Sequence, residues 1–135
     1  METFLITKPS DAIRARQRVR EMARTLGFGL VDQTKIAFTV SEFALKLISR
    51  ADQCRMNLDY AGKEEGKTGI EVRLYEQYRS RENVDADWAA QLVDDLDVNR
   101  NCSDETFITF RKWRTPALAH ESIMSSPVFA AGEEQ

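Results

Sequence analysis

The sequence predicts a two-layer α/β (α+β) sandwich, in which a mixed, mainly antiparallel sheet of about four strands carries helices on one face. Two patterns and the chain length lead to this fold class. Apolar residues between positions 12 and 51 recur with the 3.6-residue period of amphipathic helices. Apolar residues between 56 and 74 alternate with polar ones, as in half-buried strands. A chain of 135 residues fits one domain and can bury a core without metal or disulfide crosslinks.

The first predicted elements are a short strand and a helix. Residues 2–7, ETFLIT, are expected to form the strand. Pro9 ends it, and Ser10 is expected to be the N-cap of the helix that follows. Apolar residues from 12 to 26 fall on one helical stripe, and Gly27 stands where a C-cap glycine is expected.

A second helix is expected from Asp32, its N-cap, to about Ala51. Its core-facing stripe consists of Ile36, Ala37, Val40, Phe43, Ala44, Leu47 and Ile48. Phe38 and Leu45 are apolar but lie off this stripe, so the helix is expected to pack on two sides. Two interpretations of these two residues remain open. They pack under a remodelled lid, or they form an exposed partner-binding patch.

The segment GKEEGKTG, residues 62–69, lies between two predicted strands and looks almost like a phosphate-binding loop. Such a loop needs four residues between its two glycines and a helix after it. Here three residues separate Gly62 from Gly66, and the sequence GIEVRLY that follows has a strand pattern. The segment is therefore predicted to be a charged hairpin turn, in which glycines supply positive φ angles.

The rest of the chain is predicted to hold one helix and one strand. Residues 104–114, DETFITFRKWR, are expected to form the last strand. A helix over 85–98 is expected to bury Trp88, Leu92, Val93 and Leu96. We expect a single domain over residues 1–115 and a flexible C-terminal tail over 116–135.

Composition and charge argue against several classes of protein. The net charge of −3 disfavours a general nucleic-acid binder. The chain has no run of about 18 apolar residues for a membrane helix, and its start has no export leader. Cys54 and Cys102 form no CxxC pattern and are expected to be free thiols of a cytoplasmic protein. His120 is expected on the surface, with no metal-ligand cluster around it.

The segment from Ala15 to Ala51 resembles the GHKL/HATPase-type anti-sigma serine kinases of bacterial partner switching. Within it, LGFGLVDQTKIAFTVSEFALKL looks like their helix pair, whose second helix carries the metal-binding motif. WAAQLVDDLDV, residues 88–98, looks like the helix that leads into their final strand, and FRKW, residues 110–113, looks like that strand. Over about residues 10–114, the resemblance implies a Bergerat-type (GHKL-like) sandwich with a magnesium–nucleotide site.

This sequence departs from the family pattern at that nucleotide site. The family carries a Glu, the usual candidate base, and four residues later an Asn that holds magnesium. Glu42 matches the Glu, but Lys46 stands at the Asn position, and an ammonium group cannot ligate a cation. The stretch LYEQYRSRENV, which matches the family's adenine-reading Asp-x-Gly-x-Gly loop, lacks both that aspartate and glycine. No glycine lies between Ile70 and Ala131, although close approach of backbone to phosphate depends on glycine.

Glu42 and Lys46 therefore have two open interpretations. They form an ordinary i, i+4 surface ion pair, or Lys46 neutralises Glu42 and fills the metal's place in a relic pocket.

Five arginines flank the apolar stripe of the first helix, in two rows. One row consists of Arg16, Arg20 and Arg24, and the other of Arg14 and Arg18. The rows are either a solvated helix face or a docking surface for an acidic partner.

The predicted function is that of a non-catalytic regulatory protein of a bacterial partner-switching circuit, which acts by protein–protein binding. No cofactor, metal, nucleic acid or membrane is expected. The resemblance implies partners such as a sigma factor, a STAS-type antagonist or a PP2C-type phosphatase, and it is compatible with a homodimer. The alternatives are an active ATP-dependent anti-sigma serine/threonine kinase and a structural subunit of an oligomeric complex.

Overall fold

The fold is a single five-stranded sheet with two long helices on one face. The computed structural model describes residues 1–62, 66–77, 84–101 and 105–114. The helices are α1 (Pro9–Thr25) and α2 (Leu30–Ala51), together with the short 3-10 helix η1 (Asp87–Gln91). The strands are β1 (Glu2–Ile6), β2 (Cys54–Gly62), β3 (Thr68–Gln77), β4 (Asp95–Arg100) and β5 (Glu105–Trp113).

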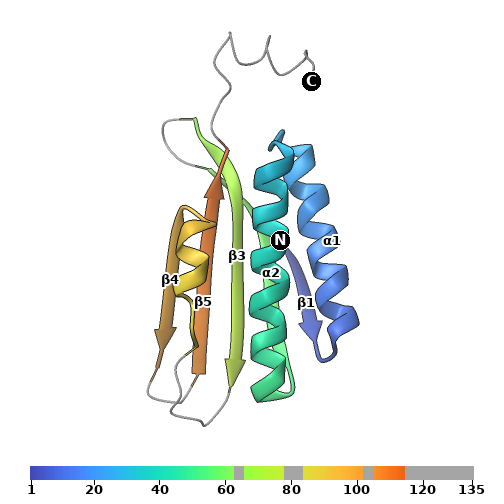
Figure 1. Cartoon of the computed structure of the whole chain (residues 1–135), viewed down its shortest axis with the longest axis vertical. Helices are drawn as coiled ribbons and strands as arrows, with labels where there is room; N and C mark the ends of the chain where they lie inside the picture. Colours follow the sequence, from blue (N-terminus) through green and yellow to red (C-terminus); the bar gives the residue numbers. More distant parts are fainter. Residues whose placement is uncertain (63–65, 78–83, 102–104, 115–135) are drawn as a thin grey trace.

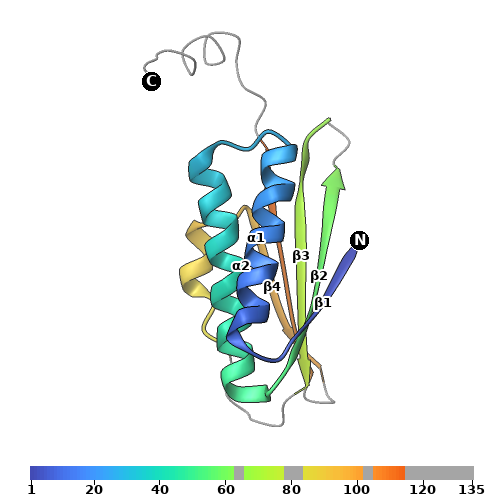
Figure 2. The same ribbon diagram turned by 90° about the vertical axis from the view of Figure 1, so that its right-hand side faces the viewer.

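The sheet has the strand order β1-β2-β3-β5-β4, and all four pairings are antiparallel (Figure 1). Seen edge-on, α1 and α2 lie against the same face of the sheet (Figure 2). The predicted two-layer sandwich is confirmed, with a fifth strand that the sequence pattern did not predict.

The core lies between the helix pair and the central strands. Ile70, Val72 and Leu74 of β3 are buried, while the residues between them face the opposite side of the sheet. Val72 pairs with Leu58 of β2 on one side and Phe110 of β5 on the other, so three strands contribute to one apolar layer. The predicted stripe of α2 is confirmed, since all its members are buried except Ile48, which is partly buried.

Residues 85–98 differ from the prediction of one helix. Only Asp87–Gln91 are helical, as the single-turn η1, and Asp95–Arg100 form the edge strand β4. From 95 to 99, Leu96 and Val98 alternate with acidic or amide residues, which is the period of a strand. Pairing this segment with β5 satisfies backbone groups at an edge that would otherwise be open.

The predicted burial of this segment is confirmed in part. Val93 is buried, whereas Trp88, Leu92 and Leu96 are partly buried against the core. The ring of Trp88 packs on that of Phe43 with centroids 4.7 Å apart. The apolar residues therefore face the core, although most of them are not in a helix.

Both predicted N-caps are wrong. In α1, Pro9 occupies the first turn and Lys8 is the N-cap, while Asp11 accepts hydrogen bonds from the backbone N–H and hydroxyl of Thr7 at 3.0 and 3.2 Å. Proline is favoured at the first helical position because its missing N–H has no acceptor there, which displaces Ser10 inward.

In α2, Gly29 is the N-cap, and Asp32 lies in the first turn, where a carboxylate still favours the helix dipole. The predicted C-cap glycine of α1 is confirmed, since Gly27 has φ +90°.

The predicted hairpin between β2 and β3 is confirmed by their antiparallel pairing from Arg55↔Tyr75 to Gly62↔Thr68. Gly66 has φ +78°, as a turn glycine should. Gly69 has another role, because a Cβ at this position would lie 2.4 Å from the backbone oxygen of Lys112. The strands β3 and β5 could not approach so closely there with any larger residue.

Several predictions fall outside the described residues. These are the centre of the hairpin turn (63–65), Cys102, His120 and the tail from 116 to 135. Within the described ranges, neither long helix combines the length and apolar character that a membrane crossing requires.

Candidate functional site

The residues that match the kinase motif lie along one face of α2. Glu42, Lys46 and Arg50 follow one another at i, i+4 spacing, so they lie one above the other. Lys46 and Arg50 line a hollow of about 200 Å³ together with Ser49 and with Val84 and Asp85, which precede η1. Among the described residues, neither Glu42 nor Lys46 takes part in an ion pair, so the structure does not contain the surface pair that the spacing suggests.

A buried ion pair near this face joins Arg50 to Glu76, the acidic residue near the end of β3. Arg50 Nε donates to Glu76 Oε1 at 2.8 Å, and Arg50 Nη2 donates to the same oxygen. The Glu76 side chain is 0% exposed and that of Arg50 is 16% exposed. Glu76 Oε2 is also buried, and no described residue donates a hydrogen bond to it.

The Arg50–Glu76 pair was not predicted from the sequence, although a signal was present. Glu76 continues the alternation of Ile70, Val72 and Leu74, so its side chain must face the core. A buried carboxylate needs a cation or several hydrogen-bond donors. The sequence pattern thus indicates that Glu76 needs a cationic or hydrogen-bonding partner. It does not identify that partner as Arg50, which is 26 residues away.

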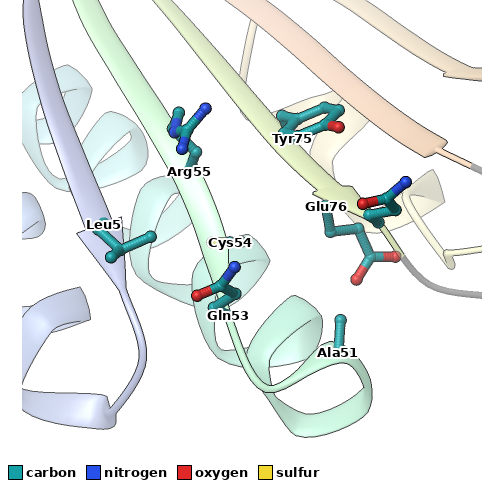
Figure 3. Close-up of a pocket in the computed structure, with 8 residues that line it drawn as sticks. Leu5, Ala51, Gln53, Cys54, Arg55, Tyr75 and Glu76 are labelled. Carbon is teal, nitrogen blue, oxygen red and sulfur yellow. The ribbon is translucent and has the colours of Figure 1, made fainter.

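Glu76 also borders a polar hollow at the ends of α2, β2 and β3, which Gln53, Cys54, Arg55 and Tyr75 line as well (Figure 3). Burial, together with the charge of Glu76, raises the pKa of the Cys54 thiol to about 12. Cys54 is therefore protonated at neutral pH and is no candidate nucleophile, because the thiolate is the reactive form.

The arginines of α1 are divided between two environments. Arg18 donates to both carboxylate oxygens of Glu2 in β1, with Nε–Oε1 at 2.7 Å, and it also contacts Glu21. Arg14 forms an ion pair with Asp11. By contrast, Arg16, Arg20 and Arg24 form no ion pair with any residue that the structure describes.

Arg16 and Arg20 line a shallow groove between the two helices. Its other lining residues are Gln17 of α1 and Thr34, Phe38 and Ser41 of α2, and its volume is about 340 Å³. Among the described residues that line it, the groove therefore has two guanidinium groups, one aromatic ring and no acidic side chain.

Phe38 connects this groove to η1. Its ring is 48% exposed, and it meets the ring of Trp88 edge to face with centroids 5.9 Å apart. Leu45 is 37% exposed and does not line the groove. Of the predicted partner-binding residues, the structure brings Arg16, Arg20 and Phe38 together and places Arg14 and Arg18 in ion pairs with other residues.

Comparison with known proteins finds a partial match. No protein-family model matches the chain. Over 67 residues it is 33% identical to the serine/threonine-protein kinase RsbT of Bacillus subtilis (strain 168). The match covers 50% of this chain and 50% of RsbT, so the chain spans about half the length of the curated relative it matches. The chain is thus similar to a protein kinase over half its length, and the resemblance of the sequence to that class is supported to this extent.

Proposed function

We propose that the protein is a non-catalytic regulator in a bacterial partner-switching circuit for sigma-factor control. It acts by binding other proteins, and it has lost the nucleotide site of its kinase relatives. The observation that carries this proposal is the ion pair of Arg50 and Glu76, which occupies the acidic side chain at the end of β3.

In the kinases that the sequence resembles, the loop that corresponds to the end of β3 carries the aspartate that reads the adenine. Here the only buried acid of β3 is Glu76, and two nitrogens of Arg50 donate to one of its oxygens. An adenine ring that binds at Glu76 would have to compete with its charge-assisted hydrogen bonds to Arg50. Such bonds are the strongest common class of hydrogen bond in proteins. The stretch after Glu76 contains no glycine with which to approach a phosphate.

The metal position is unsuited to magnesium as well. Lys46 stands where the kinases have their Asn ligand, and its ammonium group has no lone pair to donate. Magnesium requires near-octahedral oxygen ligation, and Lys46 and Arg50 place two cations beside the hollow instead. The residues present therefore do not fit a magnesium-bridged nucleotide.

Protein binding is supported by the groove between α1 and α2. Arg16 and Arg20, which form no ion pair with a described residue, lie beside a half-exposed aromatic ring and so suit an acidic partner segment with an apolar anchor. A sigma factor, a STAS-type antagonist and a PP2C-type phosphatase are the candidate partners, and a homodimer is a further one. Arg16, Arg20 and Phe38 are the proposed contact residues, with Arg24 extending the row.

The proposal is tested by melting the protein with millimolar Mg-ATP. A ligand at a hundredfold excess over its Kd adds ~2.7 kcal/mol to the free energy of unfolding, so binding would be plain as a higher Tm. We expect no rise for the natural chain or for Lys46→Asn, because the Asn restores only one lost element. RsbT serves as the positive control, and a capture experiment with the candidate partners tests binding directly.

An active serine/threonine kinase is the second candidate, since the curated relative is named as one. A Tm rise with Mg-ATP, followed by phosphate transfer to a captured partner, would establish it and overturn the non-catalytic proposal.

A further inference from the structure

We propose that the groove between α1 and α2 is the docking site for the chain's own C-terminal segment, residues 128–135. Docked there, the segment competes with the acidic partner, so the protein carries its own inhibitor. This inference rests on the docking surface in the proposed function, but not on the loss of the nucleotide site.

The groove is suited to an occupant that carries both acidic groups and an apolar side chain. Arg16 and Arg20 line it without an ion pair to any described residue, and neither Thr34 nor Ser41 can neutralise them. Phe38 presents a ring that is 48% exposed beside these cations. The volume of about 340 Å³ is roughly eleven times the ~30 Å³ of a water molecule in the liquid, so the groove has room for one large side chain.

The C-terminal segment VFAAGEEQ supplies both kinds of chemistry in the required order. Val128 and Phe129 are apolar, and Glu133 and Glu134 follow within five residues of Phe129. At neutral pH both glutamate side chains are ionised. Arginine binds carboxylates through paired N–H donors, and aromatic rings attract one another edge to face, so Phe129 and the two glutamates match Phe38 and the two arginines.

The path of the chain allows this contact. Arg114, the last described residue, has its guanidinium beside Gly27, at the turn that joins α1 to α2. Along α1, Arg20 and Arg16 lie seven and eleven residues before Gly27, which is ~10 and ~16 Å at 1.5 Å per residue. The 13 residues 115–127 can span up to ~45 Å, so the segment can reach the groove from this turn.

The opposite flank of α1 does not compete for the segment. Arg14 and Arg18 are already bound to Asp11, Glu2 and Glu21. An arriving carboxylate would have to displace an internal one there, whereas Arg16 and Arg20 are cations without an ion pair to any described residue. The charge distribution of α1 therefore selects the groove.

NMR spectra of the full-length protein test the contact. We expect Glu133→Lys/Glu134→Lys and Phe129→Ser each to shift the amide signals of Arg16, Arg20, Thr34 and Phe38. Glu121→Lys is the matched control, because it reverses a charge in the same tail outside the segment. Unchanged groove signals, or equal shifts in the control, would overturn the proposal. Shifts that grow with protein concentration would also overturn it, since they would assign the contact to a second copy.

A peptide with the sequence SPVFAAGEEQ, residues 126–135, tests the competition. A site that its own segment fills nine-tenths of the time binds an external ligand about tenfold more weakly. We therefore expect the peptide to bind the Glu133→Lys/Glu134→Lys chain about tenfold more tightly than the natural chain, and not to bind Arg16→Glu/Arg20→Glu, whose fold is checked by circular dichroism. Equal affinity of the peptide for the natural chain and for the Glu133→Lys/Glu134→Lys chain would contradict self-docking. Partner capture that still depends on Arg16 and Arg20 would then leave the proposed function standing.

Discussion

The two flanks of α1 carry the same side chain in two different states. Toward β1, Arg18 holds Glu2 and Glu21, and Arg14 holds Asp11. Toward α2, Arg16 and Arg20 border a groove and form no ion pair with a described residue. The residue type and the helix are the same, so the difference comes from the acids within reach, which are Asp11 and Glu21 on α1 itself and Glu2 on β1.

The neighbours of α1 decide which arginines remain available. β1 presents a carboxylate at Glu2, whereas the neighbouring surface of α2 presents Thr34, Phe38 and Ser41, which carry no charge. Paired arginines fasten a helix to its surroundings, and unpaired ones leave a positive field that can steer an acidic partner. The arginines of α1 are therefore available to a partner only on the flank where the described structure supplies no acid.

Arg50 is the arginine whose ion-pair partner is completely buried, so its replacement should give the largest loss of stability. Arg50→Ala leaves the carboxylate of Glu76 buried without its cation, and we expect a loss of ~3–5 kcal/mol in the free energy of unfolding. Urea denaturation measures this loss. The control is Arg50→Met/Glu76→Leu, which removes both charges and should regain most of the stability. A cost below ~1 kcal/mol for Arg50→Ala would show that the pair is not what holds Glu76.

Charge reversal of the two flanks should separate their roles. Arg16→Glu/Arg20→Glu should slow partner association at least about tenfold, because exposed charges act through steering, and should leave stability within ~0.5 kcal/mol. The matched control Arg14→Glu/Arg18→Glu places glutamates beside Asp11 and Glu2, so it should lower stability and spare association. Surface plasmon resonance at two salt concentrations and thermal melts measure both quantities. If both double variants slowed association equally, the two flanks would not differ in partner binding, contrary to the prediction.

Acid should affect the paired flank alone, and this is the smallest effect. The hydrogen bond from the backbone N–H of Thr7, with further help from Arg14, lowers the pKa of Asp11 below its ordinary 3.8. The hydrogen bonds from Arg18 lower the pKa of Glu2 below its ordinary 4.5. A carboxyl whose pKa is lowered on folding stabilises the protein above its unfolded-state pKa, and this contribution disappears as the pH falls through the folded-state value.

The pH dependence can be assigned with two variants. We expect the contribution of these groups to be fully present, and therefore constant, between pH 7 and about pH 5, and to be lost progressively below about pH 4. Asp11→Asn should flatten the acid limb of a plot of Tm against pH, whereas Arg20→Gln should leave it unchanged. An unaltered acid limb in Asp11→Asn would contradict the assignment.

Most predictions that depend on the residues of a single element agree with the structure. The stripes of α1 and α2, the alternation of β2 and β3 and the C-cap at Gly27 are all confirmed. Each depends on residues within a few positions of one another. The N-caps failed because Pro9 and Gly29, which are equally local, outweighed the polar side chains of Ser10 and Asp32.

The sequence by itself determined the periodicity of the chain, and therefore which residues face the core. It determined that Glu76 would be buried and that Leu96 would face inward. Only the tertiary structure decided that Leu96 does so from an edge strand, because the open edge of β5 pairs with it. Only the tertiary structure decided which arginines are paired, since Arg18 lies 16 residues from Glu2 and Arg50 lies 26 from Glu76. A side chain's type and spacing are local properties, but its electrostatic partner is whatever the packing of distant segments brings within reach.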